Sequence, residues 1–180
     1  MMMRWQIGKV RITKVVESGP VVTSARFFFS DPPPDLVTRN AWLKPHFANE
    51  QGKLLMSIHS FVIESSGRRM VVDTCVGNDK IRNNPGWNQL SLPYLERMVE
   101  AGFPPDSIDT VLCTHLHVDH VGWNTRWVDG RWQPTFPNAR YLFARKEWEH
   151  WSQQALAVAA SGATYGAGDS NSNGAVAGAC

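Results

Sequence analysis

Residues 10–16 alternate between apolar and polar positions, and this period of two predicts a β-strand. Four further short, largely apolar stretches also predict strands. Many residues in these stretches are β-branched or aromatic, which is typical of strands. The Ser-Ser-Gly segment after residue 64 predicts a hairpin, and Asp129-Gly130 predicts the tip of a second one. The predicted strands are residues 10–16, 57–64, 69–73, 107–113 and 139–144.

Two other stretches have the spacing of helices. One is expected to begin at Ser91, a favourable N-cap residue, and to end at Gly102, a favourable C-cap residue. Residues 145–154 predict the other helix. Because strands and helices alternate, the sequence predicts a layered α/β fold. The apolar residues expected on one face of the first helix are Leu92, Leu95, Met98 and Val99.

Two segments depart from both patterns. Residues 20–52 contain three consecutive prolines, which lack backbone donors and fix φ, so we expect a long surface excursion there. Of the last 26 residues, nineteen are Ala, Gly, Ser or Asn, and such a segment has little apolar area to offset its ordering entropy. We therefore expect a folded part over residues 1–154 and a disordered, low-complexity tail over residues 155–180. The abrupt change of composition between them is what a truncation or a shifted reading frame would produce.

The composition narrows the choice of partners. The net charge of +2 is too small to indicate binding to nucleic acid or to a membrane surface. No run approaches the roughly 18 apolar residues of a membrane span, and the first residues do not resemble a secretory signal. Three cysteines without paired spacing argue against a disulfide framework and against a thiolate zinc site. We expect a cytoplasmic protein without a nucleic-acid or membrane partner, and the sequence leaves the oligomeric state open.

The segment Thr-His-Leu-His-Val-Asp-His follows the predicted strand 107–113 directly. Neutral imidazole and carboxylate are good ligands for zinc, and they also accept iron or manganese. His115 and His117 are two positions apart, so on an extended backbone they point to the same side. Asp119 and His120 follow where the chain is expected to turn. The sequence thus predicts two pairs of ligands, for two metal ions.

The HxHxDH motif resembles that of the metallo-β-lactamase-fold hydrolases. The VVDT segment at 71–74, the GNDK segment at 77–80 and the VGWN segment at 121–124 extend the resemblance, which covers about residues 7–152. These segments are most similar to the branch of lactonases, esterases and organophosphate hydrolases. The resemblance implies an αββα sandwich, of which this chain holds the N-terminal half.

The resemblance also implies roles for individual residues. His115 and His117 would bind the first metal, and Asp119 and His120 the second. Asp73 would hold the ligand loop in place without binding metal itself. A hydroxide between two zinc ions would attack the carbonyl of a small ester or lactone, and Asp119 would act catalytically by passing a proton to the leaving oxygen.

The chain departs from the family pattern after this motif. Family members have three further ligands downstream, a His, an Asp and a His, whereas this chain has a single histidine after the motif, His150. We do not expect His150, in a predicted helix, or Asp169, in the tail, to be a ligand. Two alternatives to a zinc hydrolase therefore stay open. One is a truncated, non-catalytic fragment with incomplete metal sites, and the other is an iron-dependent oxidoreductase of the same fold.

Overall fold

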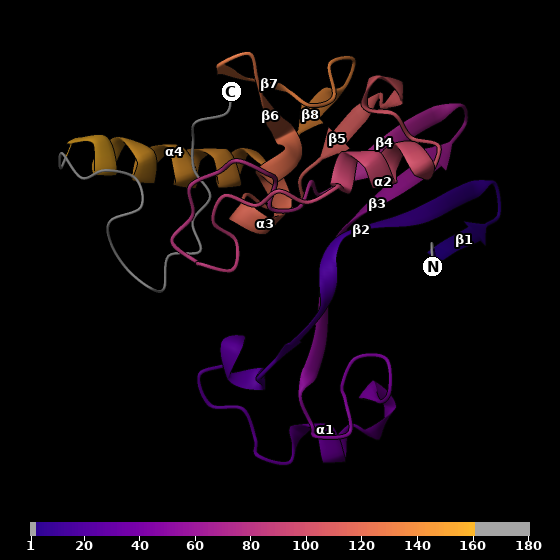
Figure 1. The fold of residues 1–180 in the computed structure, drawn as a ribbon, viewed down its shortest axis with the longest axis vertical. Coiled ribbons are helices and arrows are strands. Elements are labelled where there is room, and N and C mark those ends of the chain that lie inside the picture. The colour runs from indigo at the N-terminus through magenta and orange to yellow at the C-terminus, as the bar shows by residue number, and fades with distance from the viewer. Residues whose placement is uncertain (1–2, 161–180) are drawn as a thin grey trace. The chain divides into compact units, whose positions relative to one another are not determined.

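The computed structural model describes residues 3–160 (Figure 1). The expected disorder of the tail lies outside the described residues from residue 161 onward, and so does Asp169. The described chain divides into two compact units. One comprises residues 3–17 and 59–160, and the other comprises Ser18–Ile58.

A six-stranded mixed sheet has the order β1-β2-β3-β4-β5-β8. β1 pairs antiparallel with β2 and β3 with β4, whereas β4, β5 and β8 run parallel. A separate antiparallel hairpin consists of β6 and β7, with the predicted tip at Asp129-Gly130. The strands are β1 Met3–Ile7, β2 Val10–Thr23, β3 Leu54–Ser65, β4 Arg68–Val72, β5 Thr110–Leu112, β6 Thr125–Val128, β7 Arg131–Pro134 and β8 Arg140–Leu142.

One face of the large sheet carries the buried core. Val62 of β3 lies opposite Val71 of β4, which lies opposite Val111 of β5, and all three are fully buried. The helix α2, Tyr94–Glu100, covers this face with Tyr94 and Met98, which are also fully buried. Since successive strand residues point to opposite faces, the alternation in the sequence places these valines on one side. The predicted mixed α/β fold is confirmed.

The start of α2 corrects the sequence-based prediction. The helix begins at Tyr94 with Pro93 in the N-cap position, so Ser91 is not the cap. A proline disfavours the helical conformation of the residue before it, which keeps Leu92 out of the helix. The buried face consequently runs through Tyr94 and Met98, whereas Val99 is 54% exposed. The expected end is confirmed, because Gly102 follows the C-cap residue with a φ of +93°.

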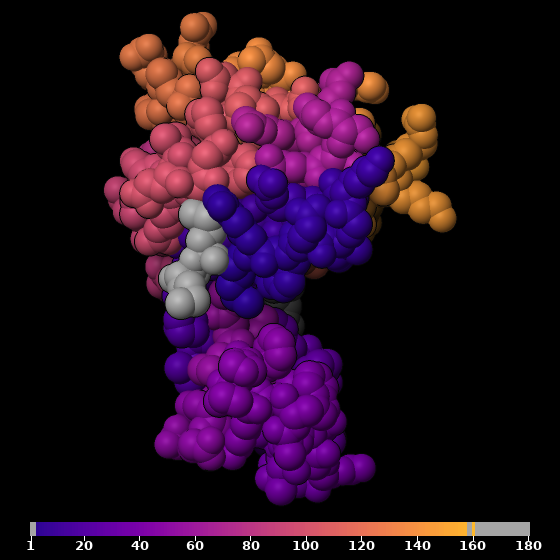
Figure 2. Space-filling model, turned by 90° about the vertical axis from the view of Figure 1, so that its right-hand side faces the viewer, coloured from indigo at the N-terminus to yellow at the C-terminus, as the bar shows by residue number. Residues whose placement is uncertain are grey.

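Several strands differ from their predicted extents, and β2 runs to Thr23 although the prediction ended at residue 16. β1 was not predicted, because all of its residues are exposed and no inward-facing alternation marks it. It lies at the surface at the indigo end of the chain (Figure 2). The predicted strand 107–113 is shorter than expected, because Pro105–Ser107 forms a 3₁₀ turn and β5 begins only at Thr110.

The remaining helices are divided between the two units of the chain. The predicted helix at 145–154 is confirmed and continues as α4 over Arg145–Ala160, so residues 155–160, which were expected in the disordered tail, are helical. Within the described part of the chain, no helix is long and apolar enough to cross a bilayer. The short helices are η1 Ala25–Phe27, α1 Leu36–Arg39, η2 Ala41–Leu43, η3 Pro105–Ser107, α3 Val118–Val121 and η4 Gly122–Asn124.

Candidate metal centre

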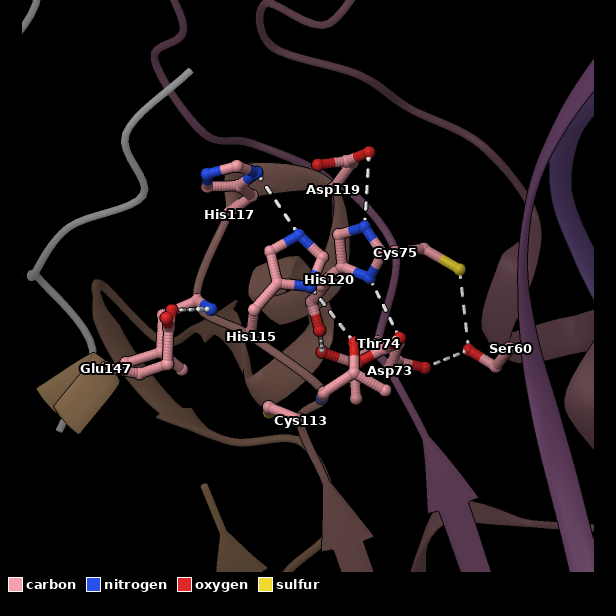
Figure 3. A network of polar contacts seen from close by, with 12 residues as sticks. Ser60, Asp73, Thr74, Cys75, Cys113, His115, His117, Asp119, His120 and Glu147 are labelled. Atoms are coloured by element: carbon pink, nitrogen blue, oxygen red, sulfur yellow. Dashed lines mark hydrogen bonds and ion pairs between the residues drawn. The ribbon is translucent and has the colours of Figure 1, made fainter. Parts of the chain in front are cut away.

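The predicted ligands lie where two neighbouring parallel strands end. Asp73 directly follows β4, and the loop Thr114–His117 follows β5, so both emerge at the same edge of the sheet. His117 is the N-cap residue of α3, whose first turn carries Asp119 and His120. The sequence-predicted side chains therefore converge in one place, although they come from segments about 40 residues apart (Figure 3).

The donor atoms form two pairs. Nε2 of His115 lies 3.1 Å from Nδ1 of His117, and Nε2 of His120 lies 3.5 Å from Oδ2 of Asp119. Two ligands of a tetrahedral zinc ion with bonds of about 2.0 Å lie about 3.3 Å apart. Both separations are therefore close to the spacing of two ligands on one metal. The rings of His115 and His120 lie 3.9 Å apart, which places the two pairs side by side.

Neither pair is a complete coordination set. Among residues 3–160, no group of three or more His, Cys, Asp or Glu side chains is arranged to hold one ion. His150 does not supplement the pairs, because its Nε2 contacts Gln154 at 3.0 Å and its ring packs on Trp151. The donors present are of a kind that binds metal ions and each pair has a suitable spacing, but two donors do not complete a site.

Asp73 links the two halves of the ligand loop. Its carboxylate accepts hydrogen bonds from the N–H of Thr114 at 2.7 Å and from the Thr114 hydroxyl at 2.8 Å. Its Oδ2 also lies 2.8 Å from Nδ1 of His120. This contact leaves Nε2 of His120 facing Asp119, which is the orientation a metal ligand needs. The backbone of Asp73 has a φ of +56°, so the chain turns sharply at the strand end to aim the carboxylate at the loop.

Burial and neighbouring side chains shift the pKa values of Asp73, His115 and His120. Burial alone lowers the pKa of His120, but hydrogen bonds to Asp119 and Asp73 outweigh it and raise the pKa to about 9. Burial alone raises the pKa of Asp73, yet His120 and Thr114 hold it below its usual value. The pKa of His115 is lowered, first by burial and then by its histidine neighbours. Without metal, His120 is therefore an imidazolium held between two carboxylates.

This arrangement predicts how the stability of the metal-free chain depends on pH. Because the folded pKa of His120 lies above that of an unfolded chain, the stabilisation is fully present below about pH 6.5 and is lost as the pH rises through about 9. The expected loss is about 2 kcal/mol, allowing for partial exposure of the ring. Denaturant titrations in the presence of chelator at pH 6 and pH 9.5 measure it. His120→Gln is expected to flatten this difference, and an equally steep dependence in that variant would contradict the assignment.

A buried carboxylate that the sequence analysis missed supports the neighbouring loop. Glu17 of β2 is 1% exposed and accepts three hydrogen bonds, from the N–H groups of Val76 and Gly77 and from the indole of Trp123. Burial raises its pKa, against the lowering effect of these donors. The signal in the sequence was its position, because Thr13, Val15 and Glu17 share the inward face of one strand. A charged residue at such a position indicates buried partners.

Lys80, in the GNDK segment, contacts the β6–β7 hairpin. Its ammonium group donates to the carbonyl of Thr125 at 3.0 Å and lies 3.7 Å from the ring centre of Trp132. Burial, followed by the charge of Arg82, lowers its pKa to about 7. Asn78 holds both backbone groups of Leu92 and so fixes the other end of this loop. The contacts of Lys80 and Asn78 therefore hold the loop that contains the GNDK segment in place.

The comparison with protein families decides the assignment. A sequence model of the metallo-beta-lactamase superfamily matches residues 55–175, which is more than half of the chain and includes every predicted ligand. The chain belongs to the metallo-beta-lactamase superfamily. Its mixed α/β fold with a large sheet matches that of solved superfamily structures.

Individual relatives are more distant. The N-acyl homoserine lactonase AiiB of Agrobacterium fabrum is 25% identical over 99 residues, which are 48% of this chain and 36% of that protein. The solved structure of the hydrolase AbOPH, of the beta-lactamase superfamily, is 25% identical with a TM-score of 0.61, and the match covers 87% of this chain and 49% of that one. The dizinc quorum-quenching lactonase AidC shares the fold at 18% identity and a TM-score of 0.59, over 83% of this chain and 47% of that one.

The chain covers only part of the length of these relatives. The chain spans about a third of the length of the curated relative and about half of each of these two solved structures.

Proposed function

We propose that this chain is the metal-binding portion of a hydrolase that cleaves an ester or lactone bond in a small molecule. The observation that carries the proposal is the pair of donor sets at the ends of β4 and β5, each spaced as two ligands of one metal are. Membership of the superfamily supports hydrolysis. The relatives named as lactonases, AiiB and AidC, support the lactone or ester as the substrate class.

In this proposal four side chains bind metal, and a fifth positions one of them. His115 and His117 hold one metal ion through Nε2 and Nδ1, and Asp119 and His120 hold the other through Oδ2 and Nε2. Asp73 keeps the imidazole of His120 in place through Nδ1. We propose zinc as the metal, because imidazole and carboxylate suit it, although the same donors also bind iron or manganese.

The chemistry divides between the metals and the chain. When bound, two metal ions supply a water whose pKa falls to about 7, and they polarise the substrate carbonyl. The carboxylate of Asp119 has a lowered pKa: burial raises it, but the hydrogen bond and charge of His120 outweigh this. It is therefore ionised at neutral pH and can take up a proton. We assign it the transfer of that proton to the leaving oxygen.

We also propose a domain assignment, a partner and a location for this chain. Residues 1–154 are the N-terminal part of a metallo-β-lactamase-like domain. Its partner is a small-molecule substrate, without nucleic acid or membrane, and its location is the cytoplasm.

The test is hydrolysis by the purified chain, stripped of metal and reloaded separately with zinc, iron or manganese. We expect slow turnover of an aryl ester or an N-acyl homoserine lactone that returns with zinc and is lost on chelation. Asp119→Asn is expected to reduce it by about 100-fold or more. Absence of turnover with every metal would contradict the proposal, as would turnover that survives chelation.

A further inference from the structure

The backbone between two of the ligand histidines is held from outside the loop. Leu116 lies between His115 and His117, and its N–H donates to Oε2 of Glu147 at 3.0 Å. Glu147 lies in the first turn of α4, 31 residues further along the chain. Figure 3 shows Glu147 and Asp73 on opposite sides of the loop. The loop is thus fixed at Thr114 by one carboxylate and at Leu116 by another.

The same carboxylate oxygen also positions an aromatic ring beside the ligands. Oε2 of Glu147 accepts a hydrogen bond from Nε1 of Trp151 at 3.2 Å, one helical turn along α4. The ring of Trp151 meets the ring of His117 edge to face, with 5.8 Å between the centroids. Glu147 therefore connects the backbone at Leu116 with the residue that packs against His117.

We infer that Glu147 is a positioning residue of the metal centre, which holds Leu116 and Trp151 so that Nδ1 of His117 faces Nε2 of His115. The inference rests on the proposed function, because it concerns how that site is kept ready for metal. Two ligands per metal make such support important, since no third described ligand fixes the ring directions. Without the Glu147 carboxylate, the N–H of Leu116 loses its partner and the spacing of the two imidazoles relaxes.

The chain offers matched variants that separate this role from general stability. Glu147→Ala removes the acceptor, whereas Glu147→Gln keeps an oxygen that can accept from Leu116. Glu149→Ala is the control, because Glu149 is exposed on the same helix and has no described hydrogen bond to the loop. Circular dichroism confirms that each variant folds before further measurement.

Two readouts are measured on the full chain. The first is the exchange rate of the Leu116 amide in the metal-free protein, by NMR. The second is the affinity for zinc, by competition with a chromogenic chelator. We expect Glu147→Ala to speed the Leu116 exchange and to lower zinc affinity by about tenfold or more. The zinc affinity of Glu147→Gln is expected to stay within about threefold of that of wild type. The zinc affinity of Glu149→Ala is expected to equal that of wild type.

The outcomes distinguish this inference from the proposed function. If wild type binds zinc and Glu147→Ala binds it equally well, the inference is overturned and the proposed function stands. If Glu147→Gln loses as much affinity as Glu147→Ala, hydrogen-bond acceptance is not the cause and the inference is also overturned. If wild type takes up no zinc, the proposed function fails, and unchanged Leu116 exchange in Glu147→Ala overturns the positioning role separately.

Discussion

Replacing Gly122 by alanine is expected to destabilise the folded chain by about 4 kcal/mol or more. A Cβ at this position would lie 1.8 Å from the carbonyl oxygen of Val76 and 2.5 Å from the nitrogen of Gly77. Both atoms belong to the backbone, so no side chain can move aside to make room. The segment at 76–77 and the segment at 122 would have to separate.

That separation would break the contacts that join the two strand-end segments. The N–H of Gly122 donates to the carbonyl of Cys75 at 2.7 Å, and the N–H of Trp123 donates to the carbonyl of Thr74 at 2.7 Å. The N–H of Thr74 in turn donates to the carbonyl of His120 at 2.7 Å. Each buried group left without a partner adds about 1–3 kcal/mol to the cost. Because His120 takes part, the damage reaches the ligand loop.

Gly8→Ala is the matched control. Gly8 has a φ of +58° and nothing within 4 Å of an added Cβ, so alanine there is strained only in its backbone and costs about 1–2 kcal/mol. Gly122 is not in the left-handed region, having a φ of −59°, so its cost is steric. Thermal unfolding followed by circular dichroism compares the two. Equal stability losses in Gly8→Ala and Gly122→Ala would show that the close approach of the two segments does not matter.

Local patterns predicted much of the fold because they report on local geometry. The short apolar runs around Val71 and Val111 predicted two strands, and the structure has a strand at each place. The spacing of His115 and His117 predicted two side chains on one side of an extended loop, and their donor atoms lie 3.1 Å apart. The period of two is a property of the backbone and needs no knowledge of neighbours.

The errors arose where neighbours decide the outcome. The start of α2 was misplaced because the N-cap preference of Ser91 was weighed without the constraint that Pro93 imposes on Leu92. The roles of Glu17 and Glu147 depend on partners 59 and 31 residues away, respectively. Composition and spacing do not show which elements become adjacent. The contact of Asp73 with the loop was anticipated only through the family resemblance.

Replacing His117 and Asp119 together by alanine is expected to abolish metal uptake. The substitutions remove one donor from each pair and leave His115 and His120 as single ligands. A single imidazole binds zinc weakly, because structural and catalytic sites have three or four protein ligands. The expected loss of affinity is about 100-fold or more. His150→Ala is the control, because His150 contacts Gln154 and lies outside both pairs.

The central claim is that these four side chains hold metal, and the zinc content of the chain tests it most directly. Wild type, His150→Ala and the double variant are loaded with zinc and dialysed against metal-free buffer. Their zinc content is then measured by inductively coupled plasma mass spectrometry. Our account predicts bound zinc in wild type and in His150→Ala, with less than about a tenth of it in the double variant. Equal zinc in all three proteins, or none in wild type, would contradict the account.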